Sequence, residues 1–332
     1  MFRQLTLAVS IRSTFDDDTA LELHGQKHKK YQRLLDRCKP LPPTSAAVAH
    51  PCDEVSLRGA IEAADLGLLT PILVGPQRKI KDTAKHLGVP ELRYEIVDAP
   101  HSQAAAEIAV RLVREGRAEL LVKGSLHTDE LMGAVVTREI GLRTARRISH
   151  CFIMDVPRLD QAIIITDAAV NIFPSLEDKV HIIQNAIDLA HALGKPLPKV
   201  AILSAMETVN PKVPSTVEAA ALCKMADRGQ ITGGILDGPL ALDNAIDLKA
   251  AKIKKIESPV AGQADILVAP DLEAGNVLAK SLTFLADADA AGIVLGARVP
   301  IILTSRADAV MTRLASCAVA VLVAKARRDG HC

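Results

Sequence analysis

Short apolar runs alternate with longer amphipathic segments along the chain from residue 53 onwards. A short apolar run bounded by turn residues is typical of a buried strand, whereas apolar positions at helical spacing predict a helix with one covered face. The first half of the chain therefore predicts, in order, helix 53–67, strand 70–75, helix 79–88, strand 94–98, helix 101–116, strand 118–124 and helix 128–139. Because strands and helices alternate, we expect a parallel sheet with helices on both faces.

The pattern changes after Gly141, where the apolar runs 151–156 and 161–168 follow each other across a short turn that contains Pro157. Since no helical length separates these runs, we expect an antiparallel hairpin that begins a second sheet. The rest of the pattern predicts helix 176–193, strand 199–205, helix 215–228, strand 233–239, strand 264–270 and helix 274–287. Two last strands, 292–297 and 299–305, lead into helix 307–327, and we expect them to rejoin the first sheet as parallel strands.

Residues 1–45 differ from the rest of the chain. They contain a basic cluster and then the turn-forming stretch 40–43, which has three prolines. We expect an N-terminal helix and linker here, with the cluster on a solvated helix face; its members are Lys27, Lys29, Lys30 and Arg33. The predicted fold class is α/β with two domains, the first over 46–148 plus 296–332 and the second over 149–295.

Composition narrows the possible functions. The 332 residues are 49% hydrophobic, and 40 basic against 39 acidic side chains give a net charge of +1, so no global field favours nucleic acid or an anionic membrane. Aromatic residues make up 2% of the chain, which leaves little for base stacking. The six cysteines show no C-x-x-C spacing, and no secretion signal or membrane-spanning run is evident. We therefore expect a cytoplasmic protein that binds neither nucleic acid nor membrane.

Polar residues gather where predicted strands end, which is the edge at which parallel α/β sheets bind ligands. The first such cluster follows strand 118–124 and contains Lys123, Gly124, Ser125, His127 and Thr128. With the N–H groups of the next helix, the Lys123, Ser125 and Thr128 side chains are placed to cradle a phosphate. A capped helix beside a surface lysine is the structural alternative.

Three further clusters follow later strands. Asn171 comes after strand 161–168, and Asp271 and Asn276 come after strand 264–270. The Asp271 carboxylate could serve as a base or as a cation ligand, and capping of the following helix is the structural alternative. The fourth cluster, at the end of strand 299–305, contains Ser305, Arg306 and Asp308, and a guanidinium beside a hydroxyl suits the oxygens of a phosphate or an acyl phosphate.

Seven motifs between about residues 30 and 325 carry a resemblance to a known family. They are KGSLHTDELM, GLRTARRISHCFIMDVP, TDAAVNIFPSLEDKVHIIQNA, VAILSAMETVNPKVPST, LDGPLALDNAI, VAGQADILVAPDLEAGNVLAK and TSRAD. Together they resemble the phosphate acetyl/butyryltransferase family, and the forms K-G-x-x-H-T-D and S-R-A-D resemble its butyryltransferase-like branch. The resemblance implies an isocitrate/isopropylmalate dehydrogenase-like fold, with parallel-rich sheets, an active-site cleft between two domains, and a homodimer.

The implied reaction is reversible transfer of an acetyl or butyryl group between coenzyme A and inorganic phosphate. Coenzyme A, phosphate and acyl phosphate are then the small-molecule partners, with coenzyme A as a substrate and no tightly bound cofactor or metal. Ser305 and Arg306 stand at the family's catalytic Ser-Arg pair. The resemblance assigns Arg306 to the phosphoryl and carbonyl oxygens and Ser305 to the developing negative charge.

The thiol-activating base departs from the family pattern, because Thr312 stands where acetyl-specific members have an aspartate. Asp308 is the first replacement that we consider, and His127 is the second. Arg143 and Arg146 resemble the region of the family's anion-binding arginines. We also expect four side chains to line the cleft, namely Lys123, Asn171, Asp271 and Asn276.

Two other functions remain open at this point. A metal- and NAD(P)-dependent decarboxylating dehydrogenase of the same fold would use Asp265, Asp271 and Glu273 as metal ligands. A non-catalytic coenzyme A-binding protein is the second alternative, because of Thr312. Cys151 and Cys317 lie in apolar segments, and we interpret both as core residues without a covalent role.

Overall fold

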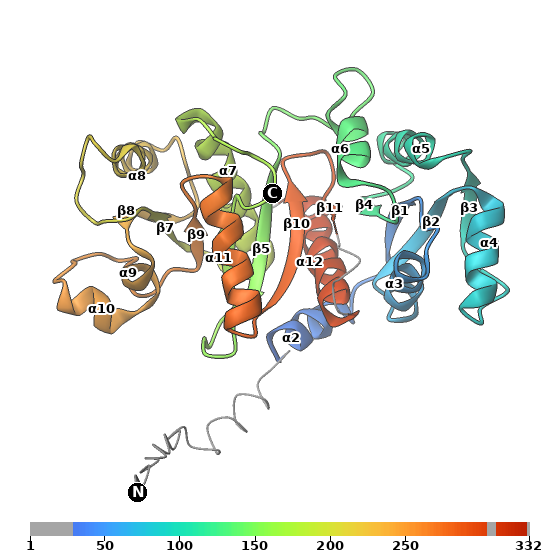
Figure 1. The fold of residues 1–332 in the computed structure, drawn as a ribbon, viewed down its shortest axis with the longest axis horizontal. Helices are drawn as coiled ribbons and strands as arrows, with labels where there is room; N and C mark the ends of the chain where they lie inside the picture. Colours follow the sequence, from blue (N-terminus) through green and yellow to red (C-terminus); the bar gives the residue numbers. More distant parts are fainter. Residues whose placement is uncertain (1–28, 304–309, 331–332) are drawn as a thin grey trace, which may run out of the picture.

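In this computed structural model, which describes residues 29–303 and 310–330, a single sheet of eleven strands runs through the protein. The strand order is β3-β2-β1-β4-β11-β10-β5-β6-β9-β7-β8 (Figure 1). Seven of the ten pairings between neighbouring strands are parallel and three are antiparallel. The α/β class and a largely parallel sheet are therefore confirmed.

The first half of the chain folds as the alternating pattern predicts. Its strands are parallel, and they are β1 (Thr44–Ala49), β2 (Leu69–Gly75), β3 (Glu95–Asp98) and β4 (Leu120–Lys123). Its helices are α3 (Glu54–Asp65), α4 (Gln77–His86), α5 (Ser102–Arg114) and α6 (Thr128–Val136). Only β1 was not foreseen: the expected linker ends at Thr44, because the small residues of TSAAVA form a buried central strand despite their modest strand propensity.

The centre of the sheet is antiparallel. The predicted hairpin is confirmed as β5 (Ser149–Asp155) and β6 (Ile163–Thr166). It does not begin a second sheet, and that expectation is wrong. On its other side, β5 forms seven antiparallel residue pairs with β10 (Asp289–Leu295), which in turn pairs with β11 (Ile301–Ile302). The expected parallel orientation of β10 is also wrong, whereas β11 lies parallel beside β4.

The other half of the sheet contains three parallel strands beyond β6, namely β9 (Ile266–Val268), β7 (Lys199–Leu203) and β8 (Ile235–Leu240). Its helices are α7 (Leu176–Ala192), α8 (Pro214–Asp227), α9 (Leu242–Ile246), α10 (Leu248–Ile253) and α11 (Leu272–Leu285). The short helices α9 and α10 were not predicted. Helix α11 covers one face of the central strands, and α12 (Val310–Arg328) packs on β10 behind them (Figure 1).

Helix α2 (Lys29–Cys38) is anchored on the central pair of strands. Tyr31 is fully buried, and its hydroxyl donates to the Ile153 carbonyl oxygen at 2.7 Å and accepts the Ala291 N–H at 2.6 Å. Lys30 Nζ lies 2.6 Å from the Asp155 carboxylate, whose side chain is 2% exposed. The expectation of a solvated basic face is therefore wrong for Lys30, because this ammonium balances a buried charge on β5.

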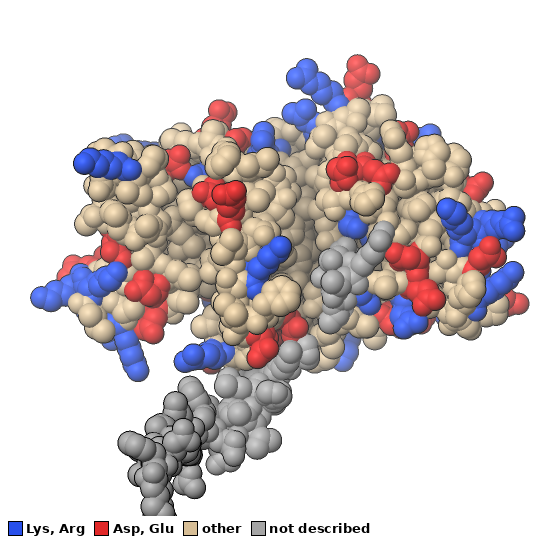
Figure 2. All heavy atoms as spheres, in the orientation of Figure 1, with Lys and Arg blue, Asp and Glu red and all other residues tan. Residues whose placement is uncertain are grey.

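Charged side chains of both signs are interspersed over the face drawn in Figure 2. This distribution agrees with the net charge of +1, and no large region of a single sign is visible on that face. No helix within residues 29–303 and 310–330 is long and apolar enough to cross a membrane.

Buried titratable groups line the central strands. Burial lowers the pKa of His150 to about 4, although the nearby Asp167 charge opposes this shift. Burial also raises the pKa values of Cys151 and Cys317 to about 12. Both thiols are therefore unreactive core groups, as the sequence predicted.

We predict that Lys30→Ala lowers the free energy of unfolding by about 3–5 kcal/mol, because Asp155 is left as a buried, uncompensated charge. Lys39→Ala is a matched control, since Lys39 makes a pair of similar length with Asp36, 2.7 Å, but at the surface. It should leave the urea midpoint nearly unchanged. Equal midpoints for the two variants would contradict the anchoring role of Lys30.

We also predict that His150 makes the fold sensitive to acid. Its pKa is about 4 in the folded state and 6.5 in the reference state, so the unfolded chain binds the extra proton and stability falls as the pH drops from 6.5 towards 4. His150→Asn should therefore flatten the dependence of the urea midpoint on pH in this window. The exposed His86→Asn is the control, and a slope that both variants share with the unaltered protein argues against the assignment.

Candidate functional site

The first group of predicted residues lies where β4 ends. The half-buried Lys123 folds over the following turn, and its Nζ donates to the Leu126 carbonyl oxygen at 3.2 Å. Because β11 runs parallel to β4 with Ile302 beside Val122, Leu303 leaves the sheet at the same edge as Lys123. Leu303 is also the last residue that the structure describes before residues 304–309. This edge therefore brings Lys123 next to the start of the segment that carries the predicted Ser-Arg pair.

Ser305, Arg306 and Asp308 themselves lie outside the described residues. Beyond them, Thr312 is 7% exposed on α12, and its carbonyl oxygen accepts the Ser316 hydroxyl at 3.0 Å. The residue at the family's usual base position is thus part of the helix core.

Gly124 and Ser125 join the end of β4 to the end of β1. Their N–H groups donate to the carbonyl oxygens of Ala49 and His50, each at 2.9 Å. A Cβ on Gly124 would collide with both oxygens, which explains the glycine. The Ser125 hydroxyl donates to the His50 carbonyl oxygen at 2.7 Å and lies 2.9 Å from His50 Nδ1. Any phosphate that binds Ser125 must compete with these bonds.

Helix α6 begins directly after this turn, with His127 and Thr128 both exposed. The His127 N–H donates to the Glu130 carboxylate at 2.8 Å, and the Ser102 hydroxyl donates to the same carboxylate at 2.6 Å. The bond from Ser102, followed by that from His127, lowers the pKa of Glu130. The first turn of α6 thus already has an anionic partner, and the His127 side chain stands in solvent beside it.

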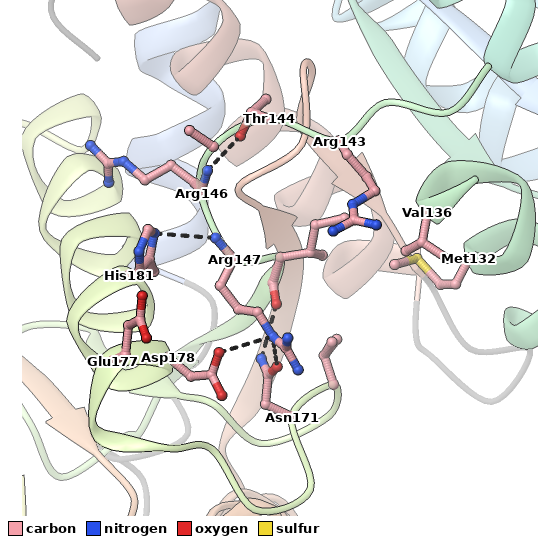
Figure 3. Close-up of a pocket in the computed structure, with 13 residues that line it drawn as sticks. Met132, Val136, Arg143, Thr144, Arg146, Arg147, Asn171, Glu177, Asp178 and His181 are labelled. Carbon is pink, nitrogen blue, oxygen red and sulfur yellow. Dashed lines mark hydrogen bonds and ion pairs between the residues drawn. The ribbon is translucent and has the colours of Figure 1, made fainter. Parts of the chain in front are cut away.

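The second group surrounds a pocket of about 440 Å³ between α6 and α7. The segment Arg143 to Arg147, which leads into β5, forms one wall, and Met132 and Val136 on α6 form another (Figure 3). The Arg143 side chain extends across the pocket towards α6, and it has no hydrogen-bond or acidic partner among the described residues (Figure 3). Arg143 is therefore available for an anionic ligand.

Arg146 and Arg147 point differently. Arg146 turns towards α7, where it lies 3.3 Å from the Asp188 carboxylate (Figure 3). Arg147 Nε donates to Asn171 Oδ1 at 2.8 Å and lies 3.5 Å from the Asp178 carboxylate. These two arginines are thus held by protein groups, whereas no such group holds Arg143 within residues 29–303 and 310–330.

Asn171 belongs to a buried network after β6. Its Nδ2 donates to the Ile148 carbonyl oxygen at 2.9 Å and to the Asp167 carboxylate at 2.5 Å. The same carboxylate accepts the N–H groups of Ala169 and Val170 at 2.9 and 3.0 Å. Asn171 therefore fixes the loop and, through Arg147, the wall of the pocket.

Asp271 and Asn276 both serve α11. Asp271 is the N-cap and accepts the Ala274 N–H at 2.8 Å, as the helix-capping alternative predicted. Asn276 Nδ2 donates to the Ala168 carbonyl oxygen at 3.1 Å, which ties α11 to the loop after β6. Neither side chain lines the pocket between α6 and α7.

Helix α6 connects the two groups, since it starts beside Lys123 and its last turns line the pocket. Its nine residues correspond to roughly 13 Å. The arrangement therefore places a lysine near one end of α6 and a guanidinium near the other.

Three residues at this site were missed from the sequence. His50 follows the unrecognised strand β1, and burial, with Lys79 as a further cause, lowers its pKa. Asp167 was visible in the motif but not singled out, and Arg147 was given no role. An aspartate followed by small residues at a strand end was the available signal for Asp167, because it is typical of side-chain bonding to loop N–H groups.

Comparison with solved structures supports the fold. The chain resembles a branched-chain phosphotransacylase from Enterococcus faecalis, with a TM-score of 0.74 and 30% identity over 85% of this chain and 99% of that one. It shares its fold with a 4-hydroxythreonine-4-phosphate dehydrogenase from Klebsiella pneumoniae, with a TM-score of 0.53 and 14% identity over 85% of this chain and 99% of that one. The dehydrogenase-like fold that the resemblance implied is thus seen in a solved neighbour.

Sequence comparison gives the same family. The chain is 67% identical to a phosphate acetyltransferase of Rhizobium meliloti over 90% of this chain and 95% of the relative. It is 43% identical to a phosphate butyryltransferase of Clostridium beijerinckii over 89% of this chain and 98% of the relative. Residues 102–321 match the family described as phosphate acetyl/butaryl transferase. This chain therefore belongs to the phosphate acetyl/butyryltransferase family.

Proposed function

We propose that this protein catalyses the reversible transfer of an acyl group between coenzyme A and inorganic phosphate. The observation that carries this proposal is the 67% identity to a phosphate acetyltransferase over nearly the whole length of both chains. The Arg143 guanidinium in the pocket, for which the described part of the chain supplies no acidic partner, and Lys123 at the strand edge support it, because both substrates are anionic.

Acetyl is the acyl group that we propose. The relative named as a phosphate acetyltransferase is 67% identical, whereas the relative named as a phosphate butyryltransferase is 43% identical. The butyryltransferase-like motifs leave a larger acyl group as the alternative outcome of the assay.

The proposed reaction is direct attack of the coenzyme A thiolate on the carbonyl carbon of the acyl phosphate. A carbon–sulfur bond forms, the carbon–oxygen bond to phosphate breaks, and the thiol proton passes to a protein base. Arg306 and Lys123 would hold the phosphoryl oxygens, and Ser305 would donate to the oxyanion. Support for this grouping comes from β11, which ends beside β4 and so starts the 304–309 segment at the edge that carries Lys123.

Arg143 would bind another anionic part of the substrate. The length of α6, roughly 13 Å, separates this guanidinium from the turn after Lys123, and coenzyme A is long enough to reach both. In this proposal the active site is a cleft between the two halves of the sheet, with the loop around Asn171 and the start of α11 on its far side.

A homodimer and a cytoplasmic location complete the proposal. The exposed face of α11 carries large apolar side chains, with Val277, Phe284 and Leu285 exposed by 64%, 80% and 85%, and a second subunit would remove them from water. The five described cysteines are free thiols, which suits a reducing compartment.

The dehydrogenase alternative receives less support. Asp265 and Asp271 flank β9 at opposite ends, and Asp265 lies 2.7 Å from Lys195 Nζ. No group of three His, Cys, Asp or Glu side chains within 29–303 and 310–330 is placed to hold a metal ion. The carboxylates that this alternative requires therefore do not converge.

The direct test is an assay of thioester formation from coenzyme A with acetyl phosphate or butyryl phosphate, followed by absorbance. We predict turnover with both and a higher kcat/KM for acetyl phosphate. No thioester from either donor, with coenzyme A binding intact, would support the non-catalytic alternative instead.

A chelator should leave this rate unchanged. The acyl phosphate is already activated, so positioning and fixed positive charges are sufficient for the proposed attack. The check is the initial rate after dialysis against EDTA. A loss of rate that a divalent cation restores would contradict the proposed mechanism.

Substitutions of Asp308 and His127 test which residue is the base. Asp308→Asn should lower turnover by about 10²- to 10⁴-fold with little change in the KM of acyl phosphate, and the loss should shrink as the pH nears the thiol pKa. Arg306→Ala should instead raise this KM while turnover falls, because a fixed charge is removed. If Asp308→Asn keeps full activity and His127→Gln abolishes it, the base is His127.

A further inference from the structure

A second pocket lies behind the 143–147 segment, which forms one wall of the pocket between α6 and α7. Its volume is about 360 Å³, and it is enclosed by α7, the C-terminal part of α12 and the turn after β10. Three guanidiniums line it, those of Arg146, Arg298 and Arg327, against one carboxylate, that of Asp188. The formal charge of its lining is therefore positive, although the net charge of the whole chain is only +1.

The backbone of this pocket is built to hold its shape. The Arg298 N–H donates to the Leu142 carbonyl oxygen at 2.8 Å, and an Arg327 Nη donates to the Arg298 carbonyl oxygen at 2.9 Å. At the turn, Gly296 has a φ of 84°, and a Cβ there would collide with the Arg147 carbonyl oxygen. The turn is thus fixed on both sides, which sets the backbone position of Arg298.

Arg298, on this turn, is held through its backbone. Its side chain is exposed and forms no hydrogen bond or ion pair with any residue that the structure describes, although its backbone is held at both ends. Arg146, by contrast, forms an ion pair with Asp188 at 3.3 Å, and both side chains are partly exposed to solvent. Such a half-exposed pair is weak enough for a multivalent anion to replace the carboxylate.

We propose that this arginine pocket is a second anion site, which takes a multivalent phosphate group. Guanidiniums from one helix, one turn and the segment before β5 border the pocket, and such a group favours an anion with several phosphoryl oxygens over a single carboxylate. Two sources have this chemistry: a free polyphosphate that acts as an effector, and the phosphate groups of coenzyme A, whose chain would run through the neighbouring pocket towards Lys123.

The site is coupled to the substrate pocket by a shared wall. Thr144 and Arg146 line both pockets. The Thr144 hydroxyl donates to the Gly296 carbonyl oxygen at 2.6 Å and accepts the Arg146 N–H at 3.0 Å, so the turn after β10 is bonded to the segment that carries Arg143. An anion that draws Arg146 away from Asp188 therefore acts on the backbone that presents Arg143 to the substrate.

The first test is binding of pyrophosphate to the full chain by isothermal titration calorimetry. Arg298→Gln should weaken one binding event by about tenfold, the effect of losing one charge-assisted hydrogen bond, while the fold stays intact because this side chain bonds to none of the residues that the structure describes. Arg228→Gln is the control, since it removes an exposed positive charge from the end of α8. Equal binding by the unaltered protein and Arg298→Gln, or equal losses in both variants, would overturn the proposal.

A kinetic arm, which rests on the proposed acyl transfer, distinguishes the two sources. If the occupant is the 3′-phosphate of coenzyme A, Arg298→Gln should raise the KM for coenzyme A by about tenfold and leave that for dephospho-coenzyme A unchanged, whereas if it is the pyrophosphate linkage both KM values should rise. If it is a free effector, both KM values stay constant and only the response to pyrophosphate is lost. The calorimetric result is readable even if no acyl transfer occurs, so the two proposals fail separately.

Discussion

The antiparallel pairing of β5 with β10 is the constraint on which the rest of the structure depends. Seven residue pairs join strands that are more than a hundred positions apart in the chain, and they make one sheet from two largely parallel halves. Tyr31 and Lys30 of α2 bond to the same strands, so an N-terminal helix seals the junction. Without these hydrogen bonds, β5 and β10 would each become an unpaired edge strand in the middle of the molecule.

The pairing of β5 with β10 also positions the candidate site. The Arg143 to Arg147 segment enters β5, and the turn at Gly296 leaves β10, so both elements that carry the pocket arginines are ends of the same two strands. On the other side, β11 follows β10 and lies beside β4, which aligns Leu303 with Lys123. Groups that are distant in sequence therefore meet because of two neighbouring strands, and the loops between them are short.

The sequence predicted the elements of the fold well where periodicity was strong. The alternating strands and helices between residues 53 and 136 needed only a pattern of apolar positions, and α7 was foreseen to within one residue. The antiparallel orientation of β10 could not be foreseen, because an apolar run such as GIVLGA predicts a buried strand but not the direction of that strand relative to its neighbours. β1 was missed because TSAAVA is built from small residues whose burial depends on neighbours far along the chain.

The site was predicted by residue type and not by geometry. The sequence pointed to Lys123, Arg143 and Asn171, but the roles of the last two differ. Arg143 lines a pocket, whereas the Asn171 amide is hydrogen-bonded to Asp167 and Arg147. No spacing rule distinguishes a free guanidinium from one that a distant helix supplies with a carboxylate, as Asp188 does for Arg146. That distinction arises only once α7 packs beside the 143–147 segment.

Hydrogen–deuterium exchange with and without coenzyme A and phosphate tests most directly whether these strand ends form the substrate site. The account predicts slower exchange in two separate segments, residues 123–128 and 143–148, because a single substrate spans the length of α6 between them. Slower exchange confined to regions remote from both, such as α9 and α10, would contradict the account.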